Sequence, residues 1–78
     1  MSRIPICRLG DENNTVMSYQ YIMRYKLGFD KQKVTGVFDE QMEFNVKFFQ
    51  EEHQLEKDGV IGEYTGYEMI VRCGYEEP

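Results

Sequence analysis

The sequence predicts a mainly α-helical fold, a small three-helix bundle whose helices are joined by two glycine turns. Three observations support this class. Apolar residues recur with helical spacing in three stretches, residues suited to capping helices lie at the starts of these stretches, and glycines separate them. The two turns, around Gly36 and Gly59, both contain a Gly-Val step in a DGxxG-like pattern. A chain of 78 residues has room for one domain with one core.

The first helix is expected after Gly10. Its candidate N-caps are the residues whose side-chain oxygens can accept backbone N–H groups, namely Asp11, Asn13, Asn14 and Thr15. Apolar residues then recur at helical spacing at Val16, Tyr19, Ile22, Met23 and Leu27. Gly28 is placed to end the helix in the left-handed conformation.

The central helix is expected after the first turn, the TGVF segment of residues 35–38. Asp39 is a suitable N-cap for it. Glu40 places a negative charge near the positive end of the helix dipole, which stabilises the helix. One stripe of this helix carries Met42, Val46, Phe49 and His53, with Phe44 and Phe48 beside it. A stripe of this width predicts that the helix lies at the centre of the core.

The last helix is expected after the second turn, which begins at Asp58-Gly59. Gly62 opens this element, Thr65 is the expected cap, and Gly74 is expected to stop it. The predicted core comprises Val16, Tyr19, Ile22, Phe38, Val46, Phe49, Ile61, Met69 and Ile70. The expected organisation is an N-terminal extension (residues 1–8), the helical domain (9–73) and a C-terminal tail (74–78).

An imperfect internal repeat links helices to turns. Residues 16–20 (VMSYQ) resemble 46–50 (VKFFQ), and residues 35–40 (TGVFDE) resemble 58–63 (DGVIGE). Each unit therefore pairs an aromatic-Gln step on a helix with a Gly-Val turn. We expect Gln20 and Gln50 to satisfy backbone groups of the turns, and Asp58 to form an Asx-turn. Gly36, Gly59 and Gly62 are assigned structural roles in these turns, the first two because they favour unusual backbone angles.

The net charge of −5 excludes some classes of partner. Nine basic residues are scattered among fourteen acidic ones, which disfavours nucleic acid and anionic membrane surfaces. No apolar run approaches the roughly 20 residues that span a bilayer. An uncharged glycan, a peptide or another protein remains as a possible ligand.

Reactive and metal-ligating residues are few. His53 is the only histidine, and neither Cys7 nor Cys73 has ligands at local spacing, so no metal, cofactor or catalytic residue is predicted. The two cysteines are interpreted as buried or semi-exposed thiols, with a disulfide as the alternative if the termini meet. We expect binding without catalysis.

The ordered set of motifs resembles the peptidoglycan-binding domains of the three-helix type. The resemblance covers about residues 9–71. It is carried by Val16, Tyr19-Gln20 and Leu27-Gly28 in the first helix, residues 35–39 in the first turn, Val46 and Phe49-Gln50 in the central helix, and residues 58–65 in the second turn. The sequence departs from the family pattern at Thr35, Asp39, Met42 and Glu63.

This resemblance implies a module that binds bacterial peptidoglycan in a shallow groove bordered by the turns. If the turns are neighbours, as in the family, Thr35, Asp39 and Tyr64 line the same end of the domain. Tyr64 and Tyr67 are the candidate ligand contacts, since a tyrosine ring can lie against a sugar or peptide while its hydroxyl forms hydrogen bonds. The alternative is that they cover the small core, and for Tyr67 the two roles have equal weight. The predicted ligand-binding residues are Thr35, Asp39, Asp58, Tyr64, Thr65 and Tyr67.

The alternative hypothesis is a structural or adaptor subunit of a phage or phage-tail-like particle that uses the same fold for protein contact. The segment MSRIPICRLG lacks the long apolar region and cleavage site of a signal peptide. We therefore expect synthesis in the cytoplasm and assign no final location. If the protein leaves its cell, it needs another route, such as lysis or incorporation into a virion.

Overall fold

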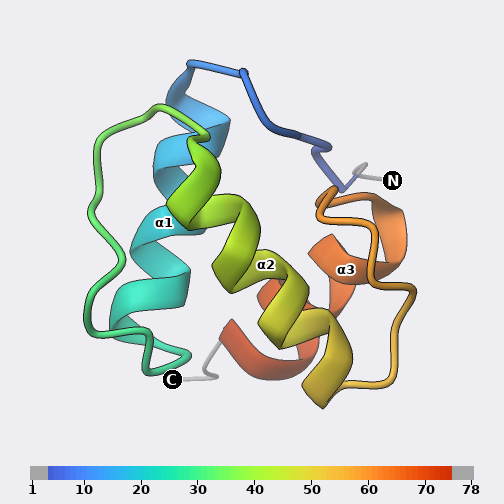
Figure 1. The fold of residues 1–78 in the computed structure, drawn as a ribbon. Coiled ribbons are helices and arrows are strands. Elements are labelled where there is room, and N and C mark those ends of the chain that lie inside the picture. Colours follow the sequence, from blue (N-terminus) through green and yellow to red (C-terminus); the bar gives the residue numbers. More distant parts are fainter. Residues whose placement is uncertain (1–3, 75–78) are drawn as a thin grey trace.

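The computed structural model describes residues 4–74, and within them it contains three α-helices followed by a short π-helix (Figure 1). The elements are α1 (Asn14–Tyr25), α2 (Glu40–Glu52), α3 (Glu63–Tyr67) and the π-helix η1 (Glu68–Gly74). In the described part of the chain, β-structure is limited to two isolated bridges. The mainly α fold class is confirmed, and the last helix continues into η1 without a break.

Helix α1 begins at one of the expected capping residues. The Asn13 side chain accepts a hydrogen bond from the Val16 backbone N–H at 2.9 Å. At the other end, Gly28 adopts the left-handed conformation with φ 86°, and Phe29 N donates to Met23 O at 2.9 Å. The Asn13 cap at the start and the left-handed Gly28 after the end therefore set the limits of the first helix.

Helix α2 is capped by Asp39, as predicted. Its carboxylate accepts from the Met42 N–H at 2.9 Å. At the C-terminal end, Gln54 takes the left-handed conformation with φ 59°, and Leu55 N donates to Gln50 O at 2.8 Å. The loop after α2 thus turns back without a glycine at this position.

Replacing Asp39 by alanine is expected to lower the free energy of unfolding by about 1 kcal/mol, because an orphan N–H of α2 loses its acceptor. Asparagine keeps a side-chain oxygen at this position, so Asp39→Asn is expected to retain most of the stability. Urea denaturation of the three proteins checks the capping role. Equal losses in both variants would contradict it.

The start of α3 corrects one prediction. Gly62, not Thr65, is the N-cap, and no side chain caps the helix. Thr65 instead lies within the first turn of α3, where it is buried and its hydroxyl accepts a hydrogen bond from the Gln50 side chain. Because Thr65 lies inside the helix with its hydroxyl bonded to Gln50, it does not cap the backbone N–H groups at the start of α3.

The core lies between the helices and includes part of the N-terminal segment. Its buried apolar side chains are Cys7, Val16, Tyr19, Met23, Phe38, Met42, Val46, Phe49, Ile61 and Met69. Cys7 pairs with Ile61 through two backbone hydrogen bonds of 3.1 and 2.9 Å. The segment before Leu9, expected as an extension, therefore supplies a core side chain. Of the expected tail 74–78, Gly74 ends η1 and residues 75–78 lie outside the described residues.

Two predicted core residues are only half-buried. On α1 the buried positions are Val16, Tyr19, Gln20 and Met23. Ile22 falls on the flank of this face, and Met23 fills the interior position instead. Ile70 packs against the core from its edge.

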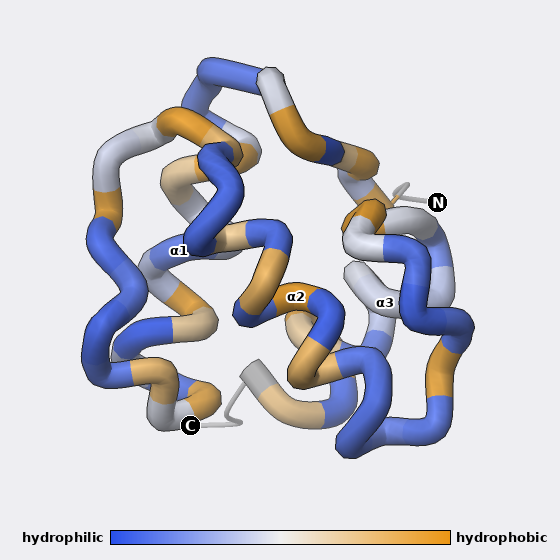
Figure 2. Tube along the Cα trace, viewed as in Figure 1, coloured by the Kyte–Doolittle hydropathy of each residue, from blue (hydrophilic) through white to orange (hydrophobic). Residues whose placement is uncertain are grey.

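Hydrophobic stretches occur in the N-terminal segment and in both glycine turns as well as in the helices (Figure 2). Phe44 and Phe48, which flank the predicted stripe of α2, are exposed. None of the helices within residues 4–74 has the length and apolarity that crossing a membrane requires.

Candidate functional site

The first glycine turn is fastened to α1 by one buried side chain. The Gln20 Oε1 atom accepts from Thr35 N at 2.9 Å and from Gly36 N at 2.7 Å. Its Nε2 atom donates to Val37 O at 2.9 Å. Gly36 has φ 86°, a conformation that disfavours residues with a Cβ. The amide thus holds the turn in the shape that its glycine permits.

The second turn repeats this arrangement on α2. The Gln50 Oε1 atom accepts from Gly59 N at 3.0 Å, and its Nε2 atom donates to Val60 O at 3.0 Å. Asp58 Oδ1 and Thr65 Oγ1 also lie 3.0 Å from Nε2. Gly59 has φ 79°. Both glutamines thus satisfy backbone groups of the turns, as predicted, and both glycines have a positive φ.

The residues that open the two turns are also equivalent. Asp58 Oδ1 accepts from Val60 N at 3.0 Å, which is the predicted Asx-turn. Thr35 Oγ1 accepts from Val37 N at 3.2 Å. Threonine at the first turn therefore makes the same bond as aspartate at the second, through a hydroxyl in place of a carboxylate. The departure from the family pattern at Thr35 leaves this turn's hydrogen bonding in place.

A hollow of about 250 Å³ lies beside the second turn. We call it the second-turn hollow, and its lining residues are Gln54, Leu55, Glu56, Asp58, Val60, Gly62, Glu63, Tyr64 and Thr65. The loop after α2 forms one wall and the start of α3 forms the other. Tyr64 is 84% exposed, so most of the residue's surface is available to a ligand.

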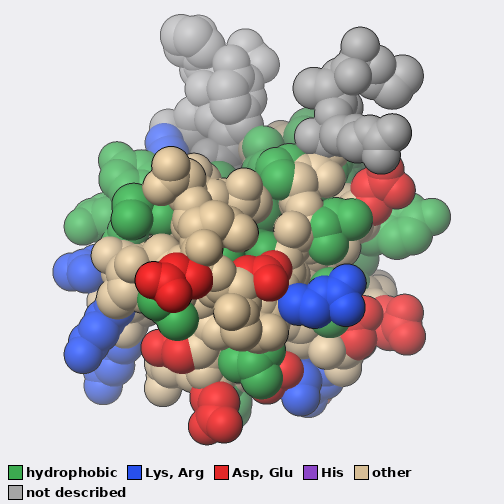
Figure 3. Space-filling view, turned by 90° about the horizontal axis from the view of Figure 1, so that it is seen from above, with side chains coloured by type: hydrophobic (Ala, Val, Ile, Leu, Met, Phe, Trp, Pro, Cys, Tyr) green, Lys and Arg blue, Asp and Glu red, His purple; other side chains and the backbone are tan. Residues whose placement is uncertain are grey.

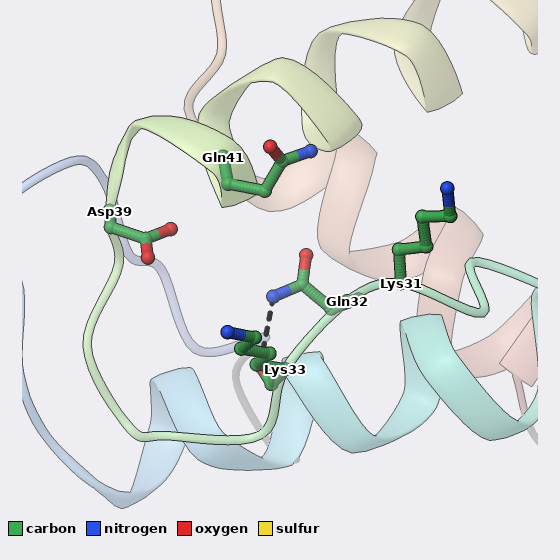
Figure 4. A pocket seen from close by; sticks show the side chains of 5 residues that line it. All are labelled: Lys31, Gln32, Lys33, Asp39 and Gln41. Carbon is green, nitrogen blue, oxygen red and sulfur yellow. Dashed lines mark hydrogen bonds between the residues drawn. The ribbon is translucent and has the colours of Figure 1, made fainter.

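A separate hollow of about 280 Å³ adjoins the start of α2 and is called the first-turn hollow (Figure 4). Lys31, Gln32 and Lys33 line it from the connection between α1 and α2, Asp39 lines it from the N-cap position before α2, and Gln41 lines it from α2 itself. The Gln32 side chain is buried, donates to Lys33 O at 2.9 Å and accepts from Asn45 at 2.9 Å. These bonds hold the lysine-bearing segment in place.

The predicted ligand residues are divided between these hollows. Asp39 lines the first-turn hollow, whereas Asp58, Tyr64 and Thr65 line the second-turn hollow. Thr35 and Tyr67 are exposed and belong to neither hollow. Thr35, Asp39 and Tyr64, which were expected to line one end of the domain, therefore do not line one hollow. The N-terminal segment nevertheless forms an isolated β-bridge to each of the two turns.

An apolar groove of about 480 Å³ runs along α1 and is lined by Asn14, Met17, Ser18, Tyr21, Ile22 and Val34. Met17 and Tyr21 are exposed. The next exposed aromatic residue, Tyr25, contacts Tyr21 with a ring-centroid distance of 4.7 Å. The half-burial of Ile22 is explained by its position in this groove.

Charge on the molecule is mixed. On the face drawn in Figure 3, acidic side chains are spread among polar ones, and Lys and Arg side chains lie in separate groups. Lys57 and Glu51 form an exposed ion pair at 3.0 Å. An exposed pair of this kind contributes little stability.

Both cysteines are free thiols in different surroundings. Burial, with a smaller contribution from Asp11, raises the pKa of Cys7 to about 12. Burial, followed by the Glu68 carboxylate, also raises the pKa of Cys73, which is only half-buried. Tyr19 lies beside Cys7, and burial raises the pKa of its phenol, whose hydroxyl donates to Pro5 O at 2.7 Å.

Iodoacetamide at pH 8 is expected to modify Cys73 in the folded protein much faster than Cys7, because Cys7 is both buried and held neutral. Mass spectrometry of the alkylated peptides checks this. Equal rates at the two cysteines under native conditions would contradict the buried position of Cys7.

The raised pKa of Cys7 also predicts a pH dependence. An unfolded thiol ionises near 9.0, whereas folded Cys7 keeps its proton to about 12, so stability falls as pH rises through this window. The free energy of unfolding is expected to fall less steeply between these values in Cys7→Ala. Parallel curves for wild type and variant would contradict the link.

Sequence reasoning missed one group of potential metal ligands. One ligand atom each from His53, Glu68 and Cys73 lies within 4.8 Å of the other two. His53 Nδ1 lies 3.5 Å from Glu68 Oε2, and the His53 ring stacks on Phe49 with a centroid distance of 4.1 Å. The spacing of these residues in the sequence does not indicate a metal site, because the group forms only where the end of α2 meets η1.

Comparison with protein families gives a match to the model described as "Putative peptidoglycan binding domain" over residues 16–69. This match covers more than half of the chain and includes both glutamines and both glycine turns. No curated protein matches the chain.

Three solved structures share the fold. The SleB N-terminal domain has a TM-score of 0.77 and 28% identity, with 88% of this chain and 93% of that chain covered. A peptidoglycan-binding protein from Clostridioides difficile in complex with glutamine hydroxamate has a TM-score of 0.79 and 25% identity, with coverage of 88% and 42%. The Burkholderia AP3 phage endolysin has a TM-score of 0.78 and 23% identity, with coverage of 95% and 27%. This chain thus spans less than half of the last two proteins.

Proposed function

Because the chain belongs to the peptidoglycan-binding domain family, we propose that it is a non-catalytic module that holds bacterial peptidoglycan in the second-turn hollow. The observation that carries this proposal is the exposed Tyr64 residue at the edge of a hollow beside the turn that Gln50 holds in place. The module acts alone or within a larger assembly.

The chemistry of the hollow suits a glycan with an attached peptide. A tyrosine ring offers an apolar face to the C–H side of a sugar, and its hydroxyl offers a hydrogen bond. The carboxylates of Glu56 and Glu63 can accept hydrogen bonds from sugar hydroxyls, from amide N–H groups or from an amine of the peptide. A shallow site of this kind favours adherence to a repeated polymer, where many weak contacts accumulate.

Tyr64→Ala is expected to reduce the affinity for purified, teichoic-acid-free sacculi by about 10-fold, since loss of one aromatic contact removes roughly 1–2 kcal/mol of binding free energy. Stability should remain within about 0.5 kcal/mol of wild type because the side chain is exposed. The measurement is a binding isotherm on sacculi at low salt.

Tyr25→Ala is the matched control, since Tyr25 is also exposed but lines neither turn hollow. It should bind sacculi like wild type. Failure of the wild-type chain to co-sediment would refute wall binding, whereas equal losses in both variants would refute the assignment to the second-turn hollow.

The apolar groove of α1 favours a second candidate function, the adaptor role in a phage or phage-tail-like particle. Met17 and Tyr21 offer exposed apolar surface for a protein partner there. A tail protein that binds the wild-type chain and Tyr64→Ala, but not Tyr21→Ser, would support this role. Retention of that protein by Tyr21→Ser would exclude the groove.

A further inference from the structure

The C-terminal end of α2 and the π-helix η1 meet at three side chains of different chemistry. His53 is the C-cap residue of α2, while Glu68 and Cys73 lie near the two ends of η1. Their ligand atoms lie within 4.8 Å of one another, and all three residues are half-buried. From this arrangement we propose that His53, Glu68 and Cys73 bind a zinc ion.

The π-helix is what places two of these ligands together. Residues five apart on an α-helix point in directions that differ by roughly 140°. In a π-helix the backbone bonds run from i to i+5, so residues five apart lie near one another, as Glu68 and Cys73 do. The π-helix is a rare conformation that is found frequently at functional sites, and here it has an identifiable consequence.

The donor set matches zinc rather than a harder cation. Zinc binds thiolate, imidazole and carboxylate ligands in tetrahedral geometry, whereas calcium and magnesium prefer oxygen ligands alone. Tetrahedral bonds of 2.0–2.3 Å place neighbouring ligand atoms roughly 3.5 Å apart. His53 Nδ1 and Glu68 Oε2 already have this separation, at 3.5 Å. The ligand atom of Cys73 lies within 4.8 Å of those of the other two residues, so it has to approach by no more than about 1 Å. The fourth position is left to water or to a ligand.

The surroundings favour a fixed imidazole. The His53 ring stacks on the buried Phe49 ring with an interplanar angle of 28°. The side chains of His53 and Glu68 are 31% and 19% exposed, so solvent can deliver an ion while the ligands remain held. A bound zinc ion would connect the end of α2 to the end of η1, two places twenty residues apart in sequence. It would thereby add a cross-link to a domain with a small core.

The test uses the full chain, reduced and freed of metal. Isothermal titration with zinc sulfate is expected to give binding near one equivalent, and zinc should raise the Tm whereas magnesium should not. Cobalt in place of zinc should give a thiolate-to-metal charge-transfer absorption. Cys73→Ser and His53→Gln are each expected to weaken zinc binding by more than about 10-fold. Loss of a residue that only supports a metal ligand already lowers metal affinity by at least about this factor.

Glu52→Gln is the matched control, because Glu52 is an exposed carboxylate at the same helix end and stands outside the group. It should keep the wild-type zinc affinity. Zinc binding unchanged in Cys73→Ser or His53→Gln, or no Tm shift in wild type, would overturn the proposal. If those variants fail to fold, the wild-type chain still decides it: zinc should protect Cys73 from iodoacetamide, and an unprotected Cys73 would overturn the site.

Discussion

Gln50→Ala is expected to lower the free energy of unfolding by about 3 kcal/mol or more. The Gln50 side chain is fully buried, and its amide joins α2 to the second turn through Gly59 N and Val60 O and to α3 through Thr65 Oγ1. Each buried group left without a partner costs about 1–3 kcal/mol, and the removed side chain also leaves a cavity. For a domain of this size, such a loss lowers Tm by more than about 10 °C.

Thermal and urea denaturation of Gln50→Ala and Gln50→Glu test this directly. Glutamate keeps the shape but cannot donate to Val60 O when ionised, so it should be destabilised as well. Gln41→Ala is the matched control on the same helix, where the side chain is exposed, and it should change stability by less than about 0.5 kcal/mol. A Gln50→Ala protein within 1 kcal/mol of wild type would contradict the role of this amide.

Gly66→Ala is expected to lower the free energy of unfolding by about 3 kcal/mol. A Cβ at Gly66 would lie 2.5 Å from the Tyr19 hydroxyl and would overlap Ile4. Tyr19 cannot move away easily, because it is buried and its hydroxyl donates to Pro5 O. Overpacking at a tightly filled place costs about 1–3 kcal/mol, and here two neighbours must shift together.

Gly62→Ala is the control for the glycine substitution. Nothing lies within 4 Å of a Cβ at Gly62, and its φ of −90° is accessible to alanine. A loss below about 1 kcal/mol is expected, from the weaker N-cap alone. Equal effects of the two substitutions, measured by urea denaturation, would show that close contact with Tyr19 is not what requires glycine at position 66.

The features that the sequence predicted best depend on contacts near in the chain. Asp39 caps the helix that it precedes, and Asp58 bonds a backbone N–H two residues later. The repeat predicted the shared role of Gln20 and Gln50 because each unit carries the same pair of parts, a glutamine and a Gly-Val turn. Local chemistry and repetition are both visible without coordinates.

The features that escaped prediction depend on packing between distant segments. Thr65 was predicted to be a helix cap, but its hydroxyl accepts a hydrogen bond from the Gln50 amide, which lies on another helix. Gly66 carries no sign in the sequence that Tyr19 will lie against it. The group of His53, Glu68 and Cys73 requires both the approach of η1 to α2 and the π-helical geometry, and neither follows from residue spacing.

The candidate site was predicted in part. The second turn and Tyr64 do border a hollow, but Asp39, which follows the first turn, borders a different one with two lysines. The apolar periodicity of the helices determines which faces are buried, and it carries no information on where loops leave space between them. The long connection that supplies Lys31 and Lys33 has no helical face, so its path could not be anticipated.

The most direct test of the account is an NMR titration of the ¹⁵N-labelled chain with a soluble disaccharide-peptide fragment of peptidoglycan. Proposed binding at the second-turn hollow predicts amide shift changes concentrated in residues 54–65, with the largest changes at and next to Tyr64. Changes concentrated instead in residues 31–41 or along α1, or no changes at millimolar ligand, would contradict it.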